Sequence, residues 1–453
     1  MARGASSQFV CQTCGFIAPK WVGCCEGCGS WNSLVEENAE ASKLKKKGPD
    51  LHFSSLAEGD KGPVPRMVSG LSEFDRVTGG GLVPGSAVLL GGDPGIGKST
   101  LLLQIATRLA KHLPCGYISG EEGLDQIRMR SRRLGLEDTP LKLASSTSVA
   151  EVVKALHKEH FALAVIDSIQ TMAVPYIEAP PGTISQIRAA SHELIEATKK
   201  TGVTLIFVGH VTKEGTLAGP RILEHMVDAV LYFEGDKTNP FRILRAQKNR
   251  FGPTDELGVF DMGSHGLEEV PDPSRLFLAG RSQSTTGAAV FPGIEGSRPL
   301  LAEIQALSAN SFLNNPRRTV VGWDSGRLAM ILAILQTRAG MNMAQKDVYL
   351  NVVGGLRLTE PAADLAVAAA LLSCTLDVPL PTDSVIFGEL SLSGDIRPVS
   401  RTDLRLKEAA KLGFEGALVP TQKKKAASPP KGLRVTELAH IRDLVDFLKA
   451  KKA

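Results

Sequence analysis

The chain has 453 residues, of which 43% are hydrophobic and 22% are charged. That length suits about two to four domains with sizeable cores, and the composition excludes an intrinsically disordered or collagen-like chain. The 52 basic and 48 acidic residues nearly balance, so net charge neither demands nor excludes a nucleic-acid partner. No apolar run reaches the ~18 residues of a membrane span, and the N-terminus lacks the apolar segment of a secretory signal. We therefore expect a cytoplasmic protein with no membrane partner.

Crowded thiols near the N-terminus predict a zinc site. Residues 1–34 contain two C-x2-C knuckles, whose four thiolates suit tetrahedral Zn²⁺: Cys11, Cys14, Cys25 and Cys28. Cys24 could replace Cys25, but only Cys25 keeps the two-residue spacing of a knuckle. Such a C4 zinc finger is either a purely stabilising module that needs its metal to fold or a module that binds DNA or protein. Lys20, Trp21 and Trp31 would contact phosphates and bases in the second case and pack the small core in the first.

The rest of the chain divides into a polar linker, residues 35–62, and two larger regions. In residues 63–272 strand-like and helix-like runs alternate, which predicts a largely parallel α/β sheet. The clearest strands are expected at 87–90, 162–166, 204–208 and 229–233, and the helices between them at 99–111 and 184–200. After a junction rich in Pro, Ser and Gly, residues 284–453 carry alanine-rich helices between short strands and predict a second α/β domain.

Residues 92–99 match the phosphate-binding loop pattern G-x4-G-K-[ST] in full, between the strand at 87–90 and a helix. The glycines let backbone N–H groups surround phosphates, and the helix N-terminus adds its partial positive charge. Lys98 should reach the β- and γ-phosphates, and the Ser99 hydroxyl should bind Mg²⁺. We therefore predict ATP and Mg²⁺ as ligands, with contacts from Gly92, Asp93, Pro94, Gly95, Ile96, Gly97, Lys98, Ser99 and Thr100.

Acidic residues at two strand ends complete the predicted hydrolytic site. Asp167 ends an apolar strand downstream of the loop, where it can hold Mg²⁺ through a water molecule. Hydrolysis also needs a group that orients the attacking water, and Glu121 and Glu122 follow the strand between the two motifs. Strand parity favours Glu121, Glu122 is the alternative, and an acid that merely caps a helix is the structural interpretation.

Several motifs around this site resemble one group of proteins. The stretches 69–76 and 79–85, followed by the phosphate-binding loop, resemble the RecA-like ATPases, which include RecA, KaiC and DnaB-type helicases. The KNRFG signature of the bacterial RadA (Sms) family is matched by Lys248, Asn249, Arg250, Phe251 and Gly252. Members of that family also carry an N-terminal zinc module and a C-terminal Lon-like domain, so the resemblance covers essentially the whole chain. It implies a RecA-like P-loop core between a zinc ribbon and an α/β domain of the Lon-protease, or ribosomal protein S5 domain 2, type.

The resemblance implies a DNA-dependent ATPase of homologous recombination and DNA repair. Such a protein binds single-stranded and branched DNA and drives branch migration as a helicase-like hexameric ring, together with the recombinase RecA. A RecA-like strand-exchange protein on open filaments and an ATP-dependent regulatory switch like KaiC are the alternatives. The Lon-like domain favours closed rings over filaments, and the predicted catalytic residues favour turnover over a switch.

The resemblance also suggests roles for single residues, and it too favours Glu121. Lys248 and Arg250 would enter the ATP site of a neighbouring subunit like an arginine finger, or would simply bind DNA phosphates. His210 stands where RecA-like proteins sense the γ-phosphate, unless it is only structural. The DNA-binding candidates lie in or beside the loops that follow core strands: Lys213, Arg221 and Arg188.

The C-terminal domain resembles a Lon protease that has lost its nucleophile. A Lon protease needs a serine activated by a lysine, and Ala362 stands where that serine should be. We therefore predict a catalytically inactive scaffold that serves ring assembly and DNA contact. The remaining serines that could act instead are Ser373 and Ser391, and the basic residues near the lysine position are Arg405 and Lys407.

Overall fold

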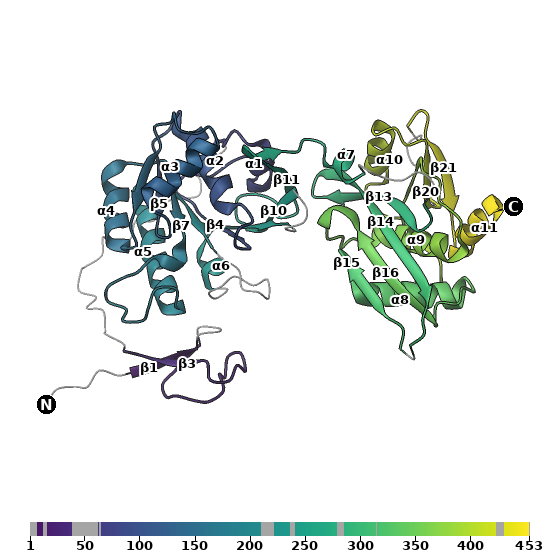
Figure 1. Cartoon of the computed structure of the whole chain (residues 1–453), viewed down its shortest axis with the longest axis horizontal. Helices are drawn as coiled ribbons and strands as arrows, with labels where there is room; N and C mark the ends of the chain where they lie inside the picture. The colour runs from purple at the N-terminus through teal and green to yellow at the C-terminus, as the bar shows by residue number, and fades with distance from the viewer. Residues whose placement is uncertain are drawn as a thin grey trace. The chain divides into compact units, whose positions relative to one another are not determined.

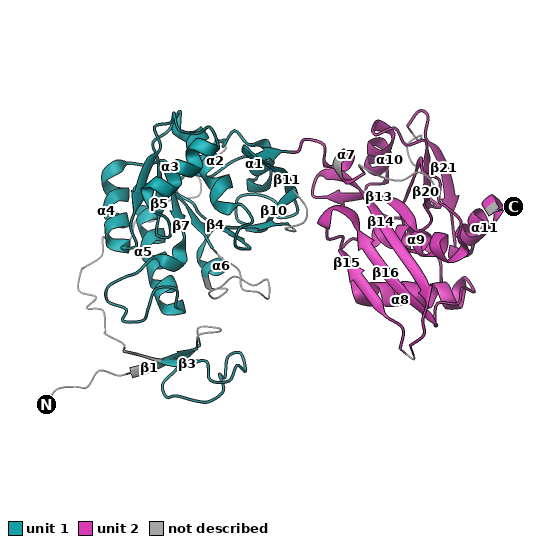
Figure 2. Ribbon diagram, viewed as in Figure 1, with its two compact units in different colours: residues 1–269 teal, residues 270–453 magenta. Residues whose placement is uncertain are grey.

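The computed structural model describes residues 7–11, 16–38, 62, 65–209, 222–235, 241–278, 285–313, 315–422 and 430–452. The chain divides into two compact units, residues 1–269 and 270–453, which Figure 2 distinguishes by colour. Figure 1 shows that each unit has its own sheet with helices packed on it. Within the described ranges, no helix is long and apolar enough to cross a bilayer.

A small antiparallel sheet forms the N-terminal ribbon. Its strand order is β2-β1-β3, with β1 at Ser7–Cys11, β2 at Ile17–Ala18 and β3 at Leu34–Asn38. The buried side chains at its centre are Cys11, Ala18, Cys25 and Leu34. Trp21 and Trp31 are 54% and 76% exposed, so the two indole rings do not pack this core. So small an apolar core needs a metal or another cross-link to be stable.

Among the described residues, a nine-stranded sheet forms the centre of the first unit, in the order β12-β11-β10-β9-β4-β8-β7-β5-β6. From β9 through to β6 the strands run parallel, whereas β10, β11 and β12 extend the sheet in antiparallel fashion. The parallel strands are β4 Ala87–Gly92, β5 Cys115–Ser119, β6 Lys142–Ser145, β7 Leu163–Asp167, β8 Thr204–Val208 and β9 Ala229–Glu234. The extension consists of β10 Phe241–Asn249, β11 Leu257–Gly263 and β12 Gly266–Glu269. The predicted α/β fold with a mostly parallel sheet is therefore confirmed.

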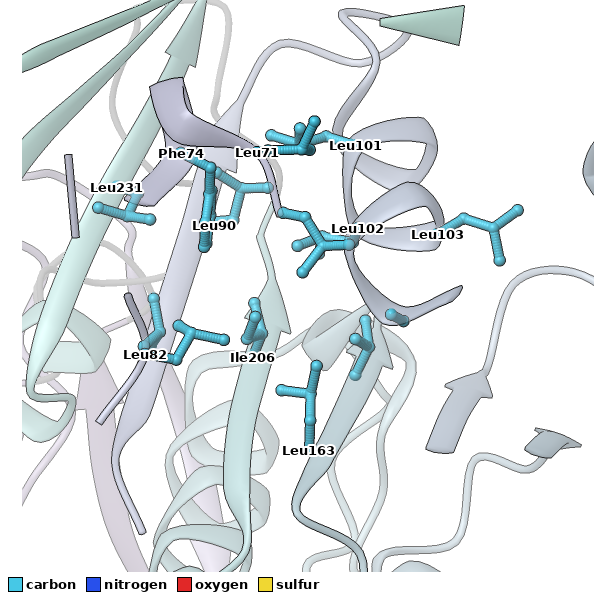
Figure 3. Close-up of a cluster of buried hydrophobic side chains, with 14 of the residues drawn as sticks. Leu71, Phe74, Leu82, Leu90, Leu101, Leu102, Leu103, Leu163, Ile206 and Leu231 are labelled. Atoms are coloured by element: carbon cyan, nitrogen blue, oxygen red, sulfur yellow. The ribbon is translucent and has the colours of Figure 1, made fainter. Parts of the chain in front are cut away.

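Helices bury both faces of this sheet. In β4, Val88 and Leu90 belong to one hydrophobic core with α1 and α2, and Leu89 belongs to the other with α4 and α5. Figure 3 shows the first core, in which Phe74 and Leu102 lie with Leu90. Burial on both faces explains why these strands read as continuous apolar runs. The helices are α1 Ser72–Thr78, α2 Lys98–Ala110, α3 Leu124–Arg133, α4 Val149–Glu159, α5 Ile184–Thr201 and α6 Ile222–Met226, with a 3-10 turn η1 at Ile169–Thr171.

In the described part of the second unit, a seven-stranded sheet has the order β15-β16-β14-β13-β17-β20-β21. Its strands are β13 Ala288–Glu295, β14 Arg298–Asn310, β15 Arg318–Val321, β16 Lys346–Val352, β17 Ser384–Ile386, β20 Gly416–Pro420 and β21 Arg434–Leu438, while β18 Glu389–Leu390 and β19 Ile396–Arg397 pair separately. The helices are α7 Pro273–Phe277, α8 Ser325–Arg338, α9 Asp364–Leu376, α10 Thr402–Lys411 and α11 Ile441–Lys452, with 3-10 turns η2 at Val353–Gly355 and η3 at Pro361–Ala363. Helix α9 is buried along most of its length and contacts β13, β14, α8 and α11. It is the central element of the core of this unit.

Candidate active site

The phosphate-binding loop joins β4 to α2 at the carboxyl edge of the parallel strands, where open α/β sheets bind ligands. Gly92 and Gly97 have φ angles of 151° and 116°, which favour glycine. A Cβ atom on Gly92 would lie 2.4 Å from the carbonyl oxygen of Phe233, and one on Gly97 would lie 2.5 Å from Met262 Cε. Glycine at these positions is therefore what allows the loop to lie so close to the neighbouring strands.

Lys98 begins α2 and is only 4% exposed. Its Nζ donates hydrogen bonds to the carbonyl oxygens of Gly92 at 2.6 Å and Asp93 at 2.9 Å, which hold the ammonium against the loop. Burial lowers the pKa of Lys98 from its usual value, and the charge of Asp167 opposes that shift. Ser99 follows, half-buried, in the first turn of the helix. A cation, a hydroxyl and a helix N-terminus thus meet at one place, as a phosphate site requires.

Asp167 ends β7 and is buried. It pairs with Ser119, the last residue of β5, so the two strands end at the same edge of the sheet. The buried Tyr117 hydroxyl donates a hydrogen bond to Asp167 Oδ2 at 2.5 Å. Sequence reasoning missed Tyr117, because a tyrosine inside an apolar strand carries no catalytic signal of its own.

The two glutamates after β5 have different partners. The Ser168 hydroxyl donates to the carboxylate of Glu121, whereas Glu122 forms an ion pair with Arg130 of α3. Ser119 Oγ accepts the backbone N–H groups of both glutamates, at 3.3 and 2.9 Å, which fixes the turn after the strand. Of the two carboxylates, that of Glu121 is held by the residue that follows Asp167.

The signature residues 248–252 begin near the N-terminal ends of the parallel strands, whereas the phosphate-binding loop follows the C-terminal end of β4. Asn249 pairs with Ala229 of β9, and Ala229 pairs with Val88, close to the start of β4. From Val88, β4 continues for four residues to Gly92. At about 3.3 Å per residue, Asn249 therefore lies roughly 13 Å from the loop along the strand direction. This separation is longer than one arginine or lysine side chain, so the signature cations lie beyond reach of the loop in their own chain.

Both signature cations have partners in their own chain. Lys248 Nζ donates to the carbonyl oxygens of Glu224 and Val227, each at 2.7 Å, at the C-terminal end of α6. Burial, followed by the charge of Arg250, lowers the pKa of Lys248. Arg250 pairs with Asp228 at 3.0 Å, yet its side chain is 56% exposed. Lys248 therefore anchors α6, whereas Arg250 presents much of its guanidinium to solvent.

One predicted DNA contact falls within the described residues. Arg188 lies near the start of α5 with an exposed side chain. The other two, Lys213 and Arg221, lie outside the described residues, and so does His210, the predicted γ-phosphate sensor. Arg188 is therefore accessible to a macromolecular ligand.

Cysteines converge in the ribbon. The Sγ atoms of Cys11, Cys25 and Cys28 lie within 4.8 Å of one another, and those of Cys11 and Cys28 are 3.7 Å apart. Two sulfurs bound to one tetrahedral zinc ion at about 2.3 Å would be about 3.8 Å apart. The Cys24 thiol instead donates to a backbone carbonyl at 3.3 Å, and Cys14 lies outside the described residues. The cluster thus contains Cys25 rather than Cys24, and its donors and spacing fit zinc.

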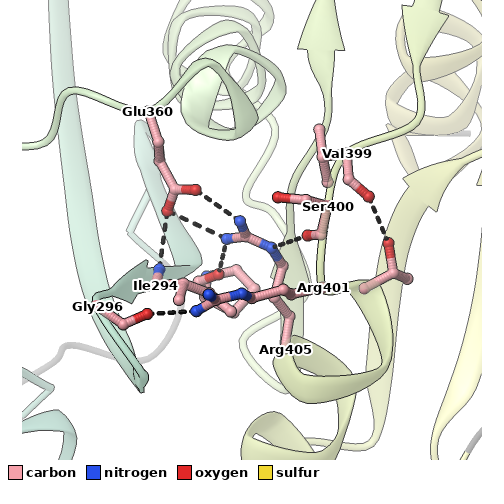
Figure 4. A network of polar contacts seen from close by, with 9 residues as sticks. Ile294, Gly296, Glu360, Val399, Ser400, Arg401 and Arg405 are labelled. Atoms are coloured by element: carbon pink, nitrogen blue, oxygen red, sulfur yellow. Dashed lines mark hydrogen bonds and ion pairs between the residues drawn. The ribbon is translucent and has the colours of Figure 1, made fainter. Parts of the chain in front are cut away.

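The position expected for a Lon-type nucleophile is buried in the second unit. Ala362 belongs to the turn η3, and Glu360, just before that turn, pairs with Arg405 of α10. The Arg405 guanidinium donates to Glu360 Oε2 at 2.6 Å and Oε1 at 3.1 Å (Figure 4). It also donates to the carbonyl oxygens of Pro292 at 2.6 Å and Ser400 at 3.2 Å. Where the resemblance expects a serine hydroxyl, the chain thus has the methyl group of Ala362, close to the ion pair between Glu360 and Arg405.

The two alternative serines have structural partners. Ser373 is fully buried and donates to the carbonyl oxygen of Val378 at 2.6 Å. Ser391 shares a hydrogen bond with Ser393 Oγ at 2.7 Å and accepts the backbone N–H of Asp395 at 3.1 Å. Neither hydroxyl contacts a lysine in the part of the chain that the structure describes, so neither resembles an activated nucleophile.

Comparison with protein families gives three matches along the chain. The family described as "AAA domain" matches residues 70–216, which include the phosphate-binding loop and Asp167. "Rubredoxin metal binding domain" matches residues 9–36, and "Subunit ChlI of Mg-chelatase" matches residues 327–423. The predicted ATP-binding core and N-terminal metal-binding finger are therefore confirmed as modules of the chain.

Curated relatives align with the chain from end to end. A protein of Brucella abortus (strain 2308) named DNA repair protein RadA is 50% identical over 98% of this chain and 98% of its own length. Proteins of the same name from Pseudomonas aeruginosa and Bacillus subtilis (strain 168) are 46% and 44% identical, over 98% and 96% of this chain and 99% and 97% of their own. A solved structure of a KaiC-like protein from Pyrococcus horikoshii matches 46% of this chain and 100% of its own, with 22% identity and a TM-score of 0.40.

Proposed function

Because this chain belongs to the RadA family of DNA repair proteins, we propose that it is a DNA-dependent ATPase of homologous recombination. It is a DNA repair ATPase by its family and its AAA domain. We infer further that it binds single-stranded and branched DNA in the cytoplasm and drives branch migration together with a RecA-type recombinase. The observation that carries the proposal is the gathering of the phosphate-binding loop, Asp167 and Glu121 at one edge of the sheet.

The side chains at this edge have complementary tasks in ATP hydrolysis. Lys98 binds the β- and γ-phosphates together with the N-terminus of α2. Ser99 and Asp167 would hold Mg²⁺, which neutralises phosphate charge when bound. Glu121 orients the attacking water, since Ser168 holds it beside the Asp167 strand end and its side chain is exposed. Glu122 is a poorer candidate, because its carboxylate already forms an ion pair with Arg130 of α3.

Arg250 is proposed to act on the ATP bound by a neighbouring subunit. It lies roughly 13 Å along β4 from the loop of its own chain, and its guanidinium is half exposed. Its partner Asp228 also accepts the backbone N–H of Ala87 at 3.0 Å, so the carboxylate keeps a partner when the arginine moves. Lys248 donates hydrogen bonds to carbonyl oxygens at the end of α6. We infer that it holds the strand that carries Arg250 in place and does not itself reach the neighbouring ATP. Action between subunits requires an assembly, for which we propose a hexameric ring.

The other modules are proposed to serve assembly and contact. The second unit acts as a scaffold of the ring without peptidase activity, because Ala362 offers no nucleophile and Arg405 is bonded to Glu360. The ribbon binds zinc through Cys11, Cys14, Cys25 and Cys28. Its exposed tryptophans leave a surface free for DNA or for the recombinase.

Steady-state ATP hydrolysis with and without single-stranded DNA tests the proposal. Lys98→Ala removes the phosphate-binding ammonium and should abolish hydrolysis. Lys111→Ala, at the exposed C-terminal end of the same helix, is the matched control and should hydrolyse ATP normally. Wild-type hydrolysis should rise several-fold with DNA.

Three other results would contradict parts of the proposed function. Hydrolysis that ignores DNA would favour a regulatory switch over a DNA motor. Normal hydrolysis by Lys98→Ala would show that the site is misassigned. Degradation of casein by the purified protein would overturn the scaffold role of the second unit.

A further inference from the structure

A buried hydroxyl touches the acid of the proposed magnesium site. Tyr117 lies in the middle of β5, and its ring is part of the core between the sheet and α2. Its hydroxyl donates to Asp167 Oδ2 at 2.5 Å, the short distance typical of an O–H donor on a carboxylate. The Tyr117 ring thus lies in the hydrophobic core, while its hydroxyl lies beside Asp167 at the C-terminal ends of the parallel strands.

The two oxygens of Asp167 have different surroundings. Oδ2 accepts the hydrogen bond from the Tyr117 hydroxyl. Within the described residues, Asp167 Oδ1 receives no hydrogen bond from the protein, so one oxygen is held and the other is free to accept from a water molecule.

Hydroxyl groups hold both carboxylates of the site. Ser168 donates to Glu121, and Tyr117 donates to Asp167. Tyr117 lies in β5 and Ser168 directly follows β7, so the two hydrogen bonds tie the ends of these strands to each other. A carboxylate that binds a metal through water must carry the charge and also point its oxygen at that water. The hydrogen-bond partners of such a carboxylate usually fix its orientation.

We propose that Tyr117 is a positioning residue for ATP hydrolysis, which orients Asp167 so that its free oxygen faces the magnesium-bound water. The proposal rests on the ATPase function proposed above. Tyr117 touches neither nucleotide nor ion; it acts through Asp167. The phosphates are held by the loop and Lys98, so binding of ATP itself does not depend on the hydroxyl.

Tyr117→Phe tests this, because it removes the hydroxyl and keeps the ring. We expect kcat to fall by about 10–100-fold, the usual cost of losing a partner of a metal-binding group, and the Mg²⁺ concentration for half-maximal hydrolysis to rise. KM for ATP should change little. A merely structural tyrosine would lower the melting temperature without moving the Mg²⁺ dependence. Tyr349→Phe, the same change in β16 of the other unit, should leave both quantities unchanged.

A double-mutant cycle shows whether the effect passes through Asp167. The readout is the Mg²⁺ dependence of binding a fluorescent ADP analogue, which does not require turnover. Tyr117→Phe should weaken this dependence in the wild-type background and add almost nothing in an Asp167→Asn background, because coupled residues are not additive. Equal effects in both backgrounds, or an unchanged Mg²⁺ dependence in folded Tyr117→Phe, would overturn the proposal. Failure of the ATPase function itself would look different, since wild-type and Lys98→Ala would then hydrolyse ATP alike.

Discussion

Replacing Glu360 by glutamine should destabilise the second unit by about 3–5 kcal/mol, because it leaves a buried arginine without its counter-charge. Arg405 is 1% exposed. Two of the four hydrogen bonds from its guanidinium end on the Glu360 carboxylate. Glutamine keeps the shape of the side chain, so the loss reports the charge rather than a cavity.

The contacts around the guanidinium set the magnitude. Two hydrogen bonds between charged groups are worth about 1.5–3 kcal/mol each, which bounds the loss at about 3–6 kcal/mol. The rings of Phe291 and Phe387, each 5.8 Å from the guanidinium carbon, and two carbonyl oxygens keep part of the stabilisation. The expected loss therefore stays below the upper end of that range, at about 3–5 kcal/mol.

Urea unfolding of the full chain, followed by tryptophan fluorescence, measures the effect. The chain has three tryptophans. Trp323 is buried in the second unit, whereas Trp21 and Trp31 are already exposed to solvent, so the change in fluorescence reports mainly on Trp323. At about 1–3 kcal/mol per molar urea, a loss of this size shifts the midpoint by about 1 M or more.

A neighbouring arginine provides the control. Arg401 is exposed and donates to the carbonyl oxygen of Gly296 (Figure 4), so Arg401→Ala should cost less than about 1 kcal/mol. A double change, Glu360→Leu with Arg405→Met, should regain stability relative to Glu360→Gln, since apolar groups can replace a buried ion pair. If Glu360→Gln unfolds at the same urea concentration as Arg401→Ala, the charge of the pair does not stabilise the unit.

Three further predictions concern the first unit. Cys28→Ser should release zinc, measured by metal analysis, while hydrolysis of ATP without DNA stays normal; one zinc retained per chain would implicate Cys24 as a substitute ligand. Arg250→Ala should leave assembly intact by sedimentation but slow hydrolysis by on the order of 10³-fold. Mixing it with Lys98→Ala subunits should restore part of the activity, and no restoration would contradict action between subunits. Gly92→Ala should lower stability by about 1–3 kcal/mol and abolish nucleotide binding, because its Cβ would lie 2.4 Å from a carbonyl oxygen; a wild-type melting temperature would contradict that contact.

The sequence predicts those parts of the fold that depend on local pattern. The strands expected at 87–90, 204–208 and 229–233 correspond to β4, β8 and β9 almost to the residue. Burial on both faces leaves uninterrupted apolar runs there, which end where the chain turns. The phosphate-binding loop is equally local, because its glycines, lysine and serine are consecutive. The antiparallel extension β10–β12 has no such pattern, and the sequence did not predict it.

Contacts between distant residues could not be predicted. Tyr117 and Asp167 are 50 positions apart, and Glu360 and Arg405 are 45 apart. No spacing rule connects such residues, because the partner of a buried polar group is chosen by the topology of the sheet. Sequence likewise suggests that Lys248 is functional but not that its ammonium meets the end of α6. The chemistry of the site is thus visible in the sequence, and its supporting hydrogen bonds are not.

The ion pair beside Ala362 also limits which substitutions this unit tolerates. A serine introduced at that position would need a nearby amine that acts as a base, and a guanidinium is a poor base. Arg405 cannot simply be exchanged for lysine either, because one ammonium cannot reproduce its fork of donors to Glu360, Pro292 and Ser400. A serine activated by a lysine at this place would require several simultaneous changes, of which the loss of Arg405 destabilises the unit by itself. The pair therefore makes a lysine-activated nucleophile at position 362 incompatible with the contacts that stabilise this unit.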